Sequence, residues 1–390
     1  MIKSKNILIC PLEWGLGHAA RMIPVARKLR DSGNNIFIGS GEKHLSLFKS
    51  EMTGLNYITF PGFKPFYSGI IPQYIVLLLQ TPYLLYHIIL EHFKLKKIIS
   101  RYDIDIVISD NRFGLWNSKV VTAYVTHMPL LPLPKPLRFL EFIGVHLHRA
   151  VINRYSICLI PDLPGEMNIS GKLSHGIKLP EHVRYTGILS RFLTDRPSSV
   201  TNPAPFPHNT VILSGPEPQR GILKQKLVSL LKDKIPFTII FEGKPYDSGK
   251  SNLSGNIIFY SHLPASEMKE VISGSERIIS RSGYTTIMDL IALRSSALLI
   301  PTPGQTEQEY LAAYLSGKGW FITVSQNETE KGLLLSPLNA TWSGEIIKES
   351  KMLLEKALVE LLQIPDKNSK YNKSGKEAGP YLPGGPVTQL

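Results

Sequence analysis

Short apolar segments alternate with amphipathic ones along most of this chain, and this alternation is the feature that most restricts its fold. Twelve segments have the length and apolar character of buried strands: residues 6–10, 35–39, 56–60, 104–109, 121–126 and 156–161, then 210–214, 237–242, 257–260, 277–280, 297–301 and 320–324. Strands separated by helices pair in parallel, because each helix carries the chain back to the starting edge of the sheet. The sequence therefore predicts an α/β protein with two doubly wound, Rossmann-like domains.

The composition of two segments indicates where these domains end. Residues 194–209 contain four prolines among Ser and Asn, which favours a stiff, extended connection. Residues 365–390 are rich in Pro, Gly, Lys, Ser and Asn and poor in apolar residues, which favours disorder. We therefore expect an N-terminal domain over 1–193, a linker over 194–209, a C-terminal domain over 210–364 and a disordered tail over 365–390.

The charge of the chain indicates an anionic partner. It has 44 Lys and Arg against 31 Asp and Glu, a formal net charge of +13, so a nucleic acid, nucleotide phosphates or an acidic membrane face could bind it. No nucleic-acid recognition motif and no basic helix with interleaved aromatic residues is present, so nucleic acid is not expected. Cys10 and Cys158 lie in apolar stretches and are interpreted as core thiols.

The N-terminus lacks the features of a signal peptide, so a cytoplasmic location is expected. The most apolar long stretch, residues 70–90, is interrupted by prolines, glutamines and a histidine, and we do not expect it to span a membrane.

The first motif with chemical meaning is Gly15-Leu16-Gly17-His18, between the first predicted strand and a helix predicted over 21–32. Two glycines let the backbone turn sharply and approach a ligand, and a helix N-terminus offers free N–H groups. The third glycine of the dinucleotide fingerprint is absent, so a nicotinamide cofactor is not expected. His18 is expected at the tip of the loop, facing the crevice at the carboxyl ends of the strands. The alternative is a structural turn in which His18 is a local cap.

A second loop, residues 214–220, has the same place in the second half. Ser214, Gly215 and nearby backbone groups could hold a diphosphate, with Arg220 supplying charge. Two prolines remove N–H donors from this loop, so a purely structural turn is the alternative.

The strongest motif follows the strand predicted over 277–280. It is the run Arg281-Ser282-Gly283-Tyr284-Thr285, after which Asp289 lies in the second turn of a predicted helix. Gly283 would permit close approach to a phosphate, and Asp289 could accept hydrogen bonds from two ribose hydroxyls. One strand later, Gln308 and Glu309 could bind sugar hydroxyls in the same crevice.

In these residues the chain resembles the inverting GT-B glycosyltransferases related to the MurG enzyme of peptidoglycan synthesis. The resemblance is clear over 259–319 and weaker over 10–30. It implies two domains facing a cleft, a nucleotide-sugar donor, most often a UDP-sugar, on the C-terminal domain, and an acceptor on the N-terminal domain. Neither a bound metal nor a cofactor beyond this co-substrate is expected.

The resemblance also suggests roles for single residues. Gly283 would approach the diphosphate, Asp289 would hold the ribose, and Gln308 with Glu309 would select the donor sugar. His262 and Leu263 fall where the family recognises the base through backbone groups. The chain departs from the family at Asp289, where a longer glutamate is usual, and at Glu309, where a second glutamine is usual, so specificity for N-acetylglucosamine is not implied.

An inverting transferase needs a base to remove the proton of the acceptor hydroxyl. His18, Asp110 and His127 are the candidates, because Asp110 and His127 follow predicted strands whose carboxyl ends face the ligand. Glu13 also lies near the first loop. Arg112 could bind an anionic acceptor or a phosphate.

Residues 65–95 and 134–154 combine Tyr, Phe, Leu and Ile with Lys, Arg and His. Apolar surface beside basic residues is typical of a protein that sits on an anionic leaflet, whereas core helices with solvated basic faces are the alternative. With the resemblance, this indicates a peripheral protein at the inner face of the cytoplasmic membrane and a lipid-linked acceptor.

The sequence therefore predicts an inverting, metal-independent glycosyltransferase that uses a lipid-linked or cell-envelope acceptor. A sugar-nucleotide hydrolase or epimerase of the same fold and a non-catalytic nucleotide-sugar-binding subunit are the alternatives.

Overall fold

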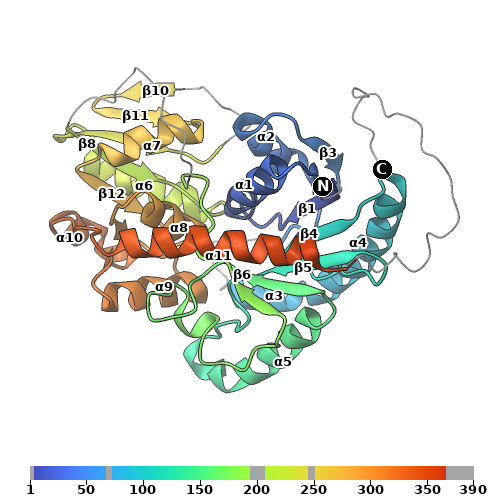
Figure 1. Ribbon diagram of the computed structural model, residues 1–390. Helices are drawn as coiled ribbons and strands as arrows, with labels where there is room; N and C mark the ends of the chain where they lie inside the picture. Colours follow the sequence, from blue (N-terminus) through green and yellow to red (C-terminus); the bar gives the residue numbers. More distant parts are fainter. Residues whose placement is uncertain (1–3, 67–72, 194–206, 245–250, 366–390) are drawn as a thin grey trace, which may run out of the picture.

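The computed structural model describes residues 4–66, 73–193, 207–244 and 251–365. Within them the strands form two seven-stranded sheets, one in each half of the chain (Figure 1). The predicted α/β class with two doubly wound sheets is confirmed. Most of the predicted linker and nearly all of the predicted tail lie outside the described residues, so their boundaries and conformation stay predictions.

The N-terminal sheet has the strand order β3-β2-β1-β4-β5-β6-β7, and every pair in it is parallel. Its strands are β1 (Asn6–Pro11), β2 (Asn35–Ser40), β3 (Asn56–Thr59), β4 (Ile106–Asp110), β5 (Val121–Val125), β6 (Ile157–Ile160) and β7 (Val183–Tyr185). All residues of β4 and β5 are buried, because helices cover both faces of a parallel sheet.

The C-terminal sheet has the order β10-β11-β9-β8-β12-β13-β14 and is parallel except for the pair β10 and β11. Its strands are β8 (His208–Ile212), β9 (Phe237–Phe241), β10 (Ser251–Ser254), β11 (Ile257–Tyr260), β12 (Arg277–Ser280), β13 (Leu298–Leu299) and β14 (Ile322–Thr323). Each predicted strand segment overlaps one of these strands, and the ends differ by no more than two residues. The sequence reading missed β7 and β10, two short edge strands that contain too few apolar residues to stand out.

The helices of the N-terminal half are α1 (Leu16–Asp31), α2 (Glu42–Glu51), α3 (Gln73–Leu79), α4 (Thr81–Arg101) and α5 (Glu141–Ile152), with short 3-10 helices η1 (Lys135–Leu140) and η2 (Gly171–Leu173). Those of the C-terminal half are α6 (Gln219–Leu231), α7 (Ala265–Ser273), α8 (Tyr284–Ala292), α9 (Thr306–Gly317), α10 (Thr329–Leu333) and α11 (Ser343–Gln363), with the 3-10 helix η4 (Gln326–Glu328). In the part of the chain that the structure describes, no helix is both long enough and apolar enough to cross a bilayer.

The start of α1 corrects one expectation. The helix begins at Leu16, after an extended Gly15, so His18 lies in its first turn and not at the tip of a loop. The apolar pattern alone placed the start near residue 21, because Gly17 and His18 do not add to that pattern.

Each sheet has one topological switch point, where the chain leaves adjacent strands in opposite directions. It lies between β1 and β4 in the N-terminal sheet and between β8 and β12 in the C-terminal sheet. Ligands of doubly wound sheets bind outside the carboxyl ends of the strands at such a point. The loops that the sequence singled out follow β1, β4, β8 and β12, so they lie at these two points.

The last helix, α11, connects the two halves (Figure 1). The hydroxyl of its Ser350 accepts a hydrogen bond from the backbone N–H of Ile188 at 2.9 Å, and its Glu360 pairs with Arg184 at 2.8 Å. One continuous buried apolar cluster includes residues of both halves. The final helix therefore packs on the N-terminal half as well as on the domain to which the sequence assigned it.

Candidate active site

A histidine and an aspartate meet at the switch point of the N-terminal sheet. Asp110 is the last residue of β4 and lies in register with Pro11, the last residue of β1. The chain turns from Pro11 into α1, which brings Nδ1 of His18 to 2.9 Å from Oδ2 of Asp110. Asp110 is fully buried, whereas the His18 side chain is 18% exposed. The pair therefore has its carboxylate inside the protein and its imidazole partly exposed at the carboxyl edge of the sheet.

Arg21, one turn after His18 on α1, contacts both members of this pair. Its Nε donates to Oδ2 of Asp110 at 3.0 Å, and its Nη2 donates to Oδ1 of the same carboxylate. Nη2 also lies 2.9 Å from Nδ1 of His18, and Nη1 lies 3.1 Å from Nδ1 of His127. The two-pronged ion pair fixes the plane of the carboxylate.

The charges in this cluster oppose the effect of burial on Asp110. Burial alone would raise the pKa of Asp110, but the Arg21 guanidinium and His18 lower this pKa to about 2. Burial and the neighbouring Arg21 lower the pKa of His18 below 6.5, and Asp110 offsets part of that decrease. At neutral pH the pair is thus an ionised carboxylate beside an uncharged imidazole, which is the state that a general base requires.

His127, which follows β5, links this cluster to the C-terminal half. Its Nε2 lies 2.9 Å from Oε1 of Glu307 on α9, and its ring stacks on Tyr284 of α8 with centroids 4.1 Å apart. Burial raises the pKa of Glu307, but His127, with His18 and Arg21, outweighs this effect and the pKa is lowered. Both ring nitrogens of His127 have partners, so in this arrangement His127 is less suited to act as the base than His18.

The first turns of α1 and α8 touch each other. The hydroxyl of Thr285 donates to the carbonyl oxygen of Gly17 at 3.1 Å. A Cβ at position 17 would lie 3.0 Å from Oγ1 of Thr285, so only glycine allows this approach without a shift. The glycine that the sequence assigned to a ligand turn thus also permits the two halves to pack.

The donor loops predicted from the sequence converge at the second switch point. A Cβ at Gly283 would lie 3.9 Å from Oγ of Ser214, so the loops after β8 and β12 are neighbours. Gly215 has φ +92°, a conformation that glycine tolerates best. Arg220 pairs with Glu217 at 2.8 Å, so its charge already has a partner at the surface of this loop.

Asp289 lies in the second turn of α8, as predicted. Its Oδ1 accepts a hydrogen bond from the hydroxyl of Ser190 at 2.6 Å. Burial raises its pKa to about 6, although Arg191 and the bond from Ser190 act in the opposite direction. Its assignment to a ribose stays a prediction.

The other predicted donor residues bond mainly to nearby backbone. Ser282 donates to the carbonyl of Gln308 at 2.8 Å, and the side-chain oxygen of Gln308 accepts from the N–H of Thr302 at 2.9 Å. Glu309 accepts from the N–H of Gly304 at 2.9 Å. These bonds hold the start of α9 against β12 and β13.

Arg281 points into the C-terminal half. Its guanidinium donates to the carbonyls of Ile300, Pro301 and Gln219 and to the side chain of Gln326. Burial lowers its pKa to about 10. Its contacts in this structure are therefore structural.

His262 and Leu263 follow β11 and are buried. Among the described residues, Nε2 of His262 has no hydrogen-bond partner, and burial together with Arg191 lowers the pKa of this histidine to about 4. The contact of His262 and Leu263 with the nucleobase of the donor stays a prediction.

Two further candidates lie beside the N-terminal switch point. Arg112 is buried and pairs with Glu91 at 3.1 Å, so an anionic acceptor would have to compete with an internal carboxylate. Glu13 accepts hydrogen bonds from the backbone N–H groups of Gly41 at 2.5 Å and Gly62 at 3.2 Å. Glu13 therefore holds the ends of β2 and β3 together.

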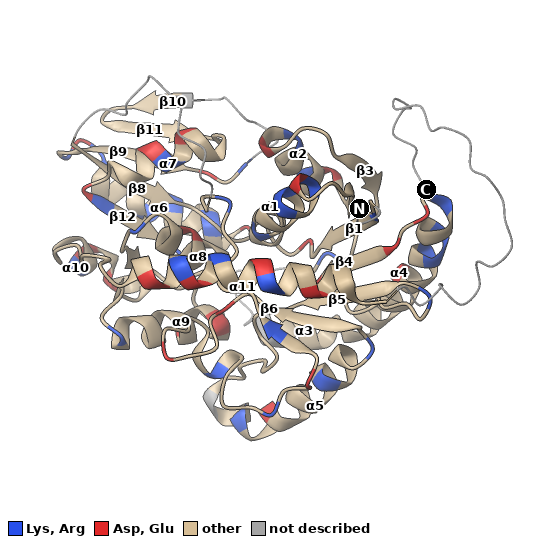
Figure 2. Ribbon diagram, viewed as in Figure 1, with Lys and Arg blue, Asp and Glu red and all other residues tan. Residues whose placement is uncertain are grey.

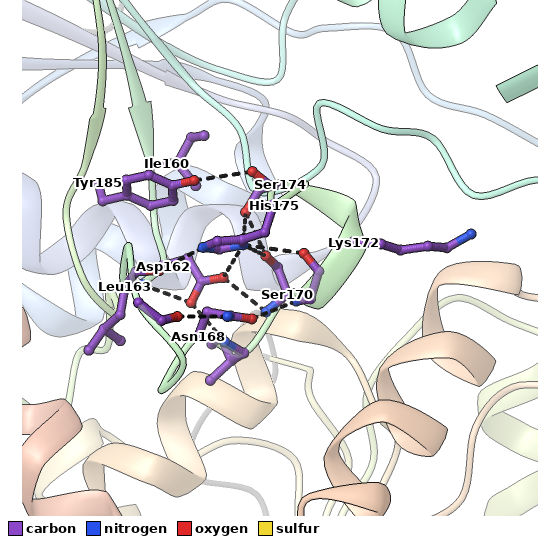
Figure 3. Close-up of polar contacts among 12 residues, drawn as sticks. Ile160, Asp162, Leu163, Asn168, Ser170, Lys172, Ser174, His175 and Tyr185 are labelled. Atoms are coloured by element: carbon purple, nitrogen blue, oxygen red, sulfur yellow. Dashed lines mark hydrogen bonds and ion pairs between the residues drawn. The ribbon is translucent and has the colours of Figure 1, made fainter. Parts of the chain in front are cut away.

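The loop after β6 packs against α9. Buried Asp162 accepts hydrogen bonds from the backbone of Leu163, Ile169 and Ser170, and His175 lies beside it (Figure 3). From α9, the hydroxyl of Tyr310 accepts the backbone N–H of Lys172 at 2.7 Å, and that of Tyr314 donates to Asn168 at 2.8 Å. These two bonds hold α9, whose first turn contains Glu307 and Gln308, against the loop.

The sequence reading missed two members of the cluster, Arg21 and Glu307. The position of Arg21 three residues after His18 was an available signal, because residues i and i+3 share a helix face. Glu307 stands next to Gln308, but no sequence pattern reveals that it contacts His127 from another sheet.

Comparison with known proteins identifies the family of the C-terminal half. Residues 222–363 match the glycosyltransferase family 28 C-terminal domain. A UDP-N-acetylglucosamine–N-acetylmuramyl-(pentapeptide) pyrophosphoryl-undecaprenol N-acetylglucosamine transferase from Prochlorococcus marinus is 32% identical over 88 residues, which are 22% of this chain and 25% of the relative. An uncharacterized glycosyltransferase from Methanosarcina mazei is 23% identical over 343 residues, 81% of this chain and 84% of that protein.

Solved structures match over nearly the whole chain. The glycotransferase of kitacinnamycin has a TM-score of 0.63 at 12% identity, over 93% of this chain and 100% of its own. The glycosyltransferase VinC, solved in complex with dTDP, has a TM-score of 0.52 at 13% identity, over 92% and 98%. At these identities the likeness concerns the fold, which is GT-B.

The chain is a relative of the MurG-type glycosyltransferases with the GT-B fold. The resemblance and the fold expected from the sequence are thereby confirmed. This MurG-related chain spans about a quarter of the length of the first curated relatives that it matches.

Proposed function

We propose that the protein is an inverting, metal-independent glycosyltransferase that moves a sugar from a nucleotide-sugar, a UDP-sugar first of all, to a lipid-linked or cell-envelope acceptor. The observation that carries the proposal is the 2.9 Å contact of Asp110 with His18 at the N-terminal switch point. Thr285, two residues after Gly283 in the matched family domain, donates to the carbonyl oxygen of Gly17 in the first turn of the helix that carries His18.

In the proposed reaction His18 is the base. Its Nδ1 faces Asp110, which leaves Nε2 for the acceptor hydroxyl. Nε2 takes the hydroxyl proton as the acceptor oxygen attacks the anomeric carbon, and the nucleoside diphosphate leaves from the opposite face. Asp110 stays ionised and stabilises the imidazolium that forms, as an aspartate does in a catalytic triad.

The proposed donor site uses the loops after β8 and β12. The free N–H groups at the start of α8 and the backbone near Ser214 would stabilise the charge of the departing diphosphate. Gln308 and Glu309 would contact the donor sugar. Two solved structures of similar fold, VinC and SpnG, are described with thymidine diphosphate bound. The test must therefore compare nucleotides that have different nucleobases.

The proposed acceptor side includes an apolar and basic outer face. Leu78 and Leu79 of α3 are 71% and 73% exposed, and Tyr86, Ile89 and Phe93 extend the apolar surface along α4. Lys and Arg lie at the far end of α4 and around α5 (Figure 2). We propose that this face rests on the anionic inner leaflet of the cytoplasmic membrane, where a lipid-linked acceptor is found.

A nucleotide titration followed by a transfer assay tests the function. We expect UDP or a UDP-sugar to bind better than GDP or dTDP, with unchanged affinity when magnesium is removed, and the binding to raise the melting temperature. We then expect transfer to a polyprenyl-linked acceptor with inversion at the anomeric carbon, read by NMR of the product. Free sugar released without any acceptor would favour the hydrolase alternative, and binding without turnover would favour the non-catalytic one.

Vesicle sedimentation tests the membrane face. We expect the protein to bind vesicles containing phosphatidylglycerol and to be released by salt, because charge attracts it to the leaflet. The double substitution Leu78→Asp and Leu79→Asp should reduce binding, whereas Leu334→Asp, at a leucine of the C-terminal half that is 82% exposed, should not. Equal loss in both variants, or equal binding to neutral vesicles, would contradict the proposal.

A further inference from the structure

Arg21 contacts the three other members of the N-terminal cluster, Asp110, His18 and His127. It is only 1% exposed, and its three nitrogens reach both oxygens of Asp110, Nδ1 of His18 and Nδ1 of His127. A buried arginine that served only as a counter-ion for Asp110 would not need the two histidines as partners. The contacts therefore indicate a role beyond charge neutralisation.

A guanidinium only donates hydrogen bonds, so a ring nitrogen that it contacts must accept. Nδ1 of His127 therefore carries no proton, and the proton of the neutral ring lies on Nε2. That nitrogen lies 2.9 Å from Oε1 of Glu307, a carboxylate that only accepts. Arg21 thus favours the tautomer of His127 that can bond to the C-terminal half.

The same reasoning applies to His18, with a different result. Its Nδ1 lies 2.9 Å from Nη2 of Arg21 and 2.9 Å from Oδ2 of Asp110. This nitrogen can either donate to Asp110 or accept from Arg21, but it cannot do both at once. When Nδ1–H donates to Asp110, Nε2 is free to act as the base. When Nδ1 accepts from Arg21, the proton is on Nε2 and the base is blocked.

We propose that Arg21 is a positioning residue that sets the tautomers of His18 and His127 and thereby couples the base of the N-terminal half to Glu307 of the C-terminal half. While Nη1 of Arg21 donates to Nδ1 of His127, whose Nε2–H in turn donates to Glu307, Nε and Nη2 donate to the Asp110 carboxylate, and this carboxylate accepts the hydrogen bond from Nδ1–H of His18. If Glu307 withdraws, His127 loses its acceptor and its hold on Nη1, and Nη2, which already lies 2.9 Å from Nδ1 of His18, can donate to that nitrogen in place of Asp110. Contact between the halves thus favours the active tautomer.

The tautomers can be read by NMR, independently of the proposed function. In protein labelled with ¹⁵N-histidine, long-range proton–nitrogen correlations identify the protonated nitrogen, and His18→Gln and His127→Gln variants assign the two rings. We expect His127 in the Nε2–H form in the wild type and a mixture of tautomers in Arg21→Lys, because a lysine keeps the charge but lacks the fork. Unchanged tautomers in folded Arg21→Lys would overturn the proposal.

The consequence for turnover rests on the proposed function. The groups that face His18 are Arg21 on α1, His44 on α2, Asp110 at the end of β4, His127 after β5 and Glu307 on α9. We expect Arg21→Lys to lower kcat by about tenfold or more with little change in KM for the donor. Arg21→Gln removes a positive charge, so the acid limb of the pH profile should move to higher pH.

Two comparisons keep the outcomes distinct. Arg184→Gln, which removes another contact between the halves at a distance from the cluster, should change neither the pH profile nor the tautomers. If Arg21→Gln does not fold, Arg21→Lys still decides the question. A wild-type protein that transfers no sugar would refute the proposed function, while the NMR result would still decide the role of Arg21.

Discussion

The polar groups at the carboxyl edge of the N-terminal sheet bond one another, whereas those at the same edge of the C-terminal sheet bond mainly their own backbone. Arg21, Asp110, His18 and His127 form one charge-coupled cluster. By contrast, Ser282, Gln308 and Glu309 bond to loop backbone within their own half. The two sheets have the same kind of switch point but present different chemistry there.

This difference indicates how the work is divided between the halves. The proposed base is already assembled without a substrate, because its charges need one another inside the protein. Among the proposed donor groups, Ser282 and Gln308 are neutral and Glu309 is exposed, so each can exchange a backbone partner for a ligand at small cost. Substitutions in the first region should therefore affect stability and turnover together, and those in the second should affect mainly binding.

The largest effect is expected for Asp110→Ala. Removing this carboxylate leaves the guanidinium of Arg21 buried without a counter-ion, so the free energy of unfolding should fall by about 3–5 kcal/mol. Glu309→Ala, which removes one exposed carboxylate from the C-terminal edge, should cost no more than about 1.5 kcal/mol. Urea unfolding of both variants measures the difference, and equal losses would remove the distinction between the two regions.

His18→Ala should act on turnover alone. The side chain is partly exposed and its loss leaves no buried charge unpaired, so we expect kcat to fall by about 100- to 10,000-fold while UDP affinity stays the same. His148→Gln, at a buried histidine of the same half, is the control for loss of an imidazole. Since burial and Arg21 lower the pKa of His18, the acid limb of wild-type kcat/KM should lie below pH 6.5. Normal turnover of His18→Ala would exclude it as the base.

Sequence reasoning found most of the N-terminal cluster because strand ends are a local property. Asp110 and His127 each follow an apolar run of strand length, and the carboxyl ends of neighbouring parallel strands meet at one edge. The same logic placed the loop over 214–220 and the run that begins at Arg281 directly after predicted strands of the second half. The alternation of apolar strand segments with amphipathic helix segments thus predicts the fold class, and the polar residues that follow the strand segments are the candidates for the site.

What the sequence could not predict depends on contacts between the halves. The bond from His127 to Glu307 joins residues 180 positions apart, and the packing of α11 on β7 depends on the final arrangement of both sheets. Arg21 was interpreted as the beginning of an amphipathic helix, because sequence alone does not say whether an arginine on α1 faces solvent or a buried carboxylate. Long-range pairing of charged groups has no local pattern.

Asp289 tests the second region through ligand binding and through pH. Asp289→Ala should weaken UDP binding by about 1–3 kcal/mol, the loss of a charge-assisted acceptor, as measured by calorimetry.

Burial raises the pKa of Asp289 to about 6, so the folded protein holds a proton that the unfolded chain releases near pH 4. Wild-type stability should therefore fall as the pH rises from about 4 to 6 relative to that of Asp289→Asn.

Uridine separates this ribose contact from the phosphate site, since it contains the ribose without a titrating phosphate. Its affinity should increase as the pH rises through about 6, because the carboxylate is the better acceptor. A pH-independent uridine affinity, or unchanged UDP binding in folded Asp289→Ala, would contradict the ribose assignment.

The smallest effect is expected for Arg184→Gln, which separates surface contacts between the halves from buried ones. Arg184 and Glu360 form a two-pronged pair, but both side chains are more than a third exposed, so water and salt already screen their attraction. The loss in unfolding free energy should be below about 1 kcal/mol and should decrease further at high salt.

Glu307→Ala, which removes the partner of buried His127, should lower the unfolding free energy by more and should also lower turnover. If the surface pair proved as important as the buried one, contact between the halves in general, and not the charge-coupled cluster, would control the base.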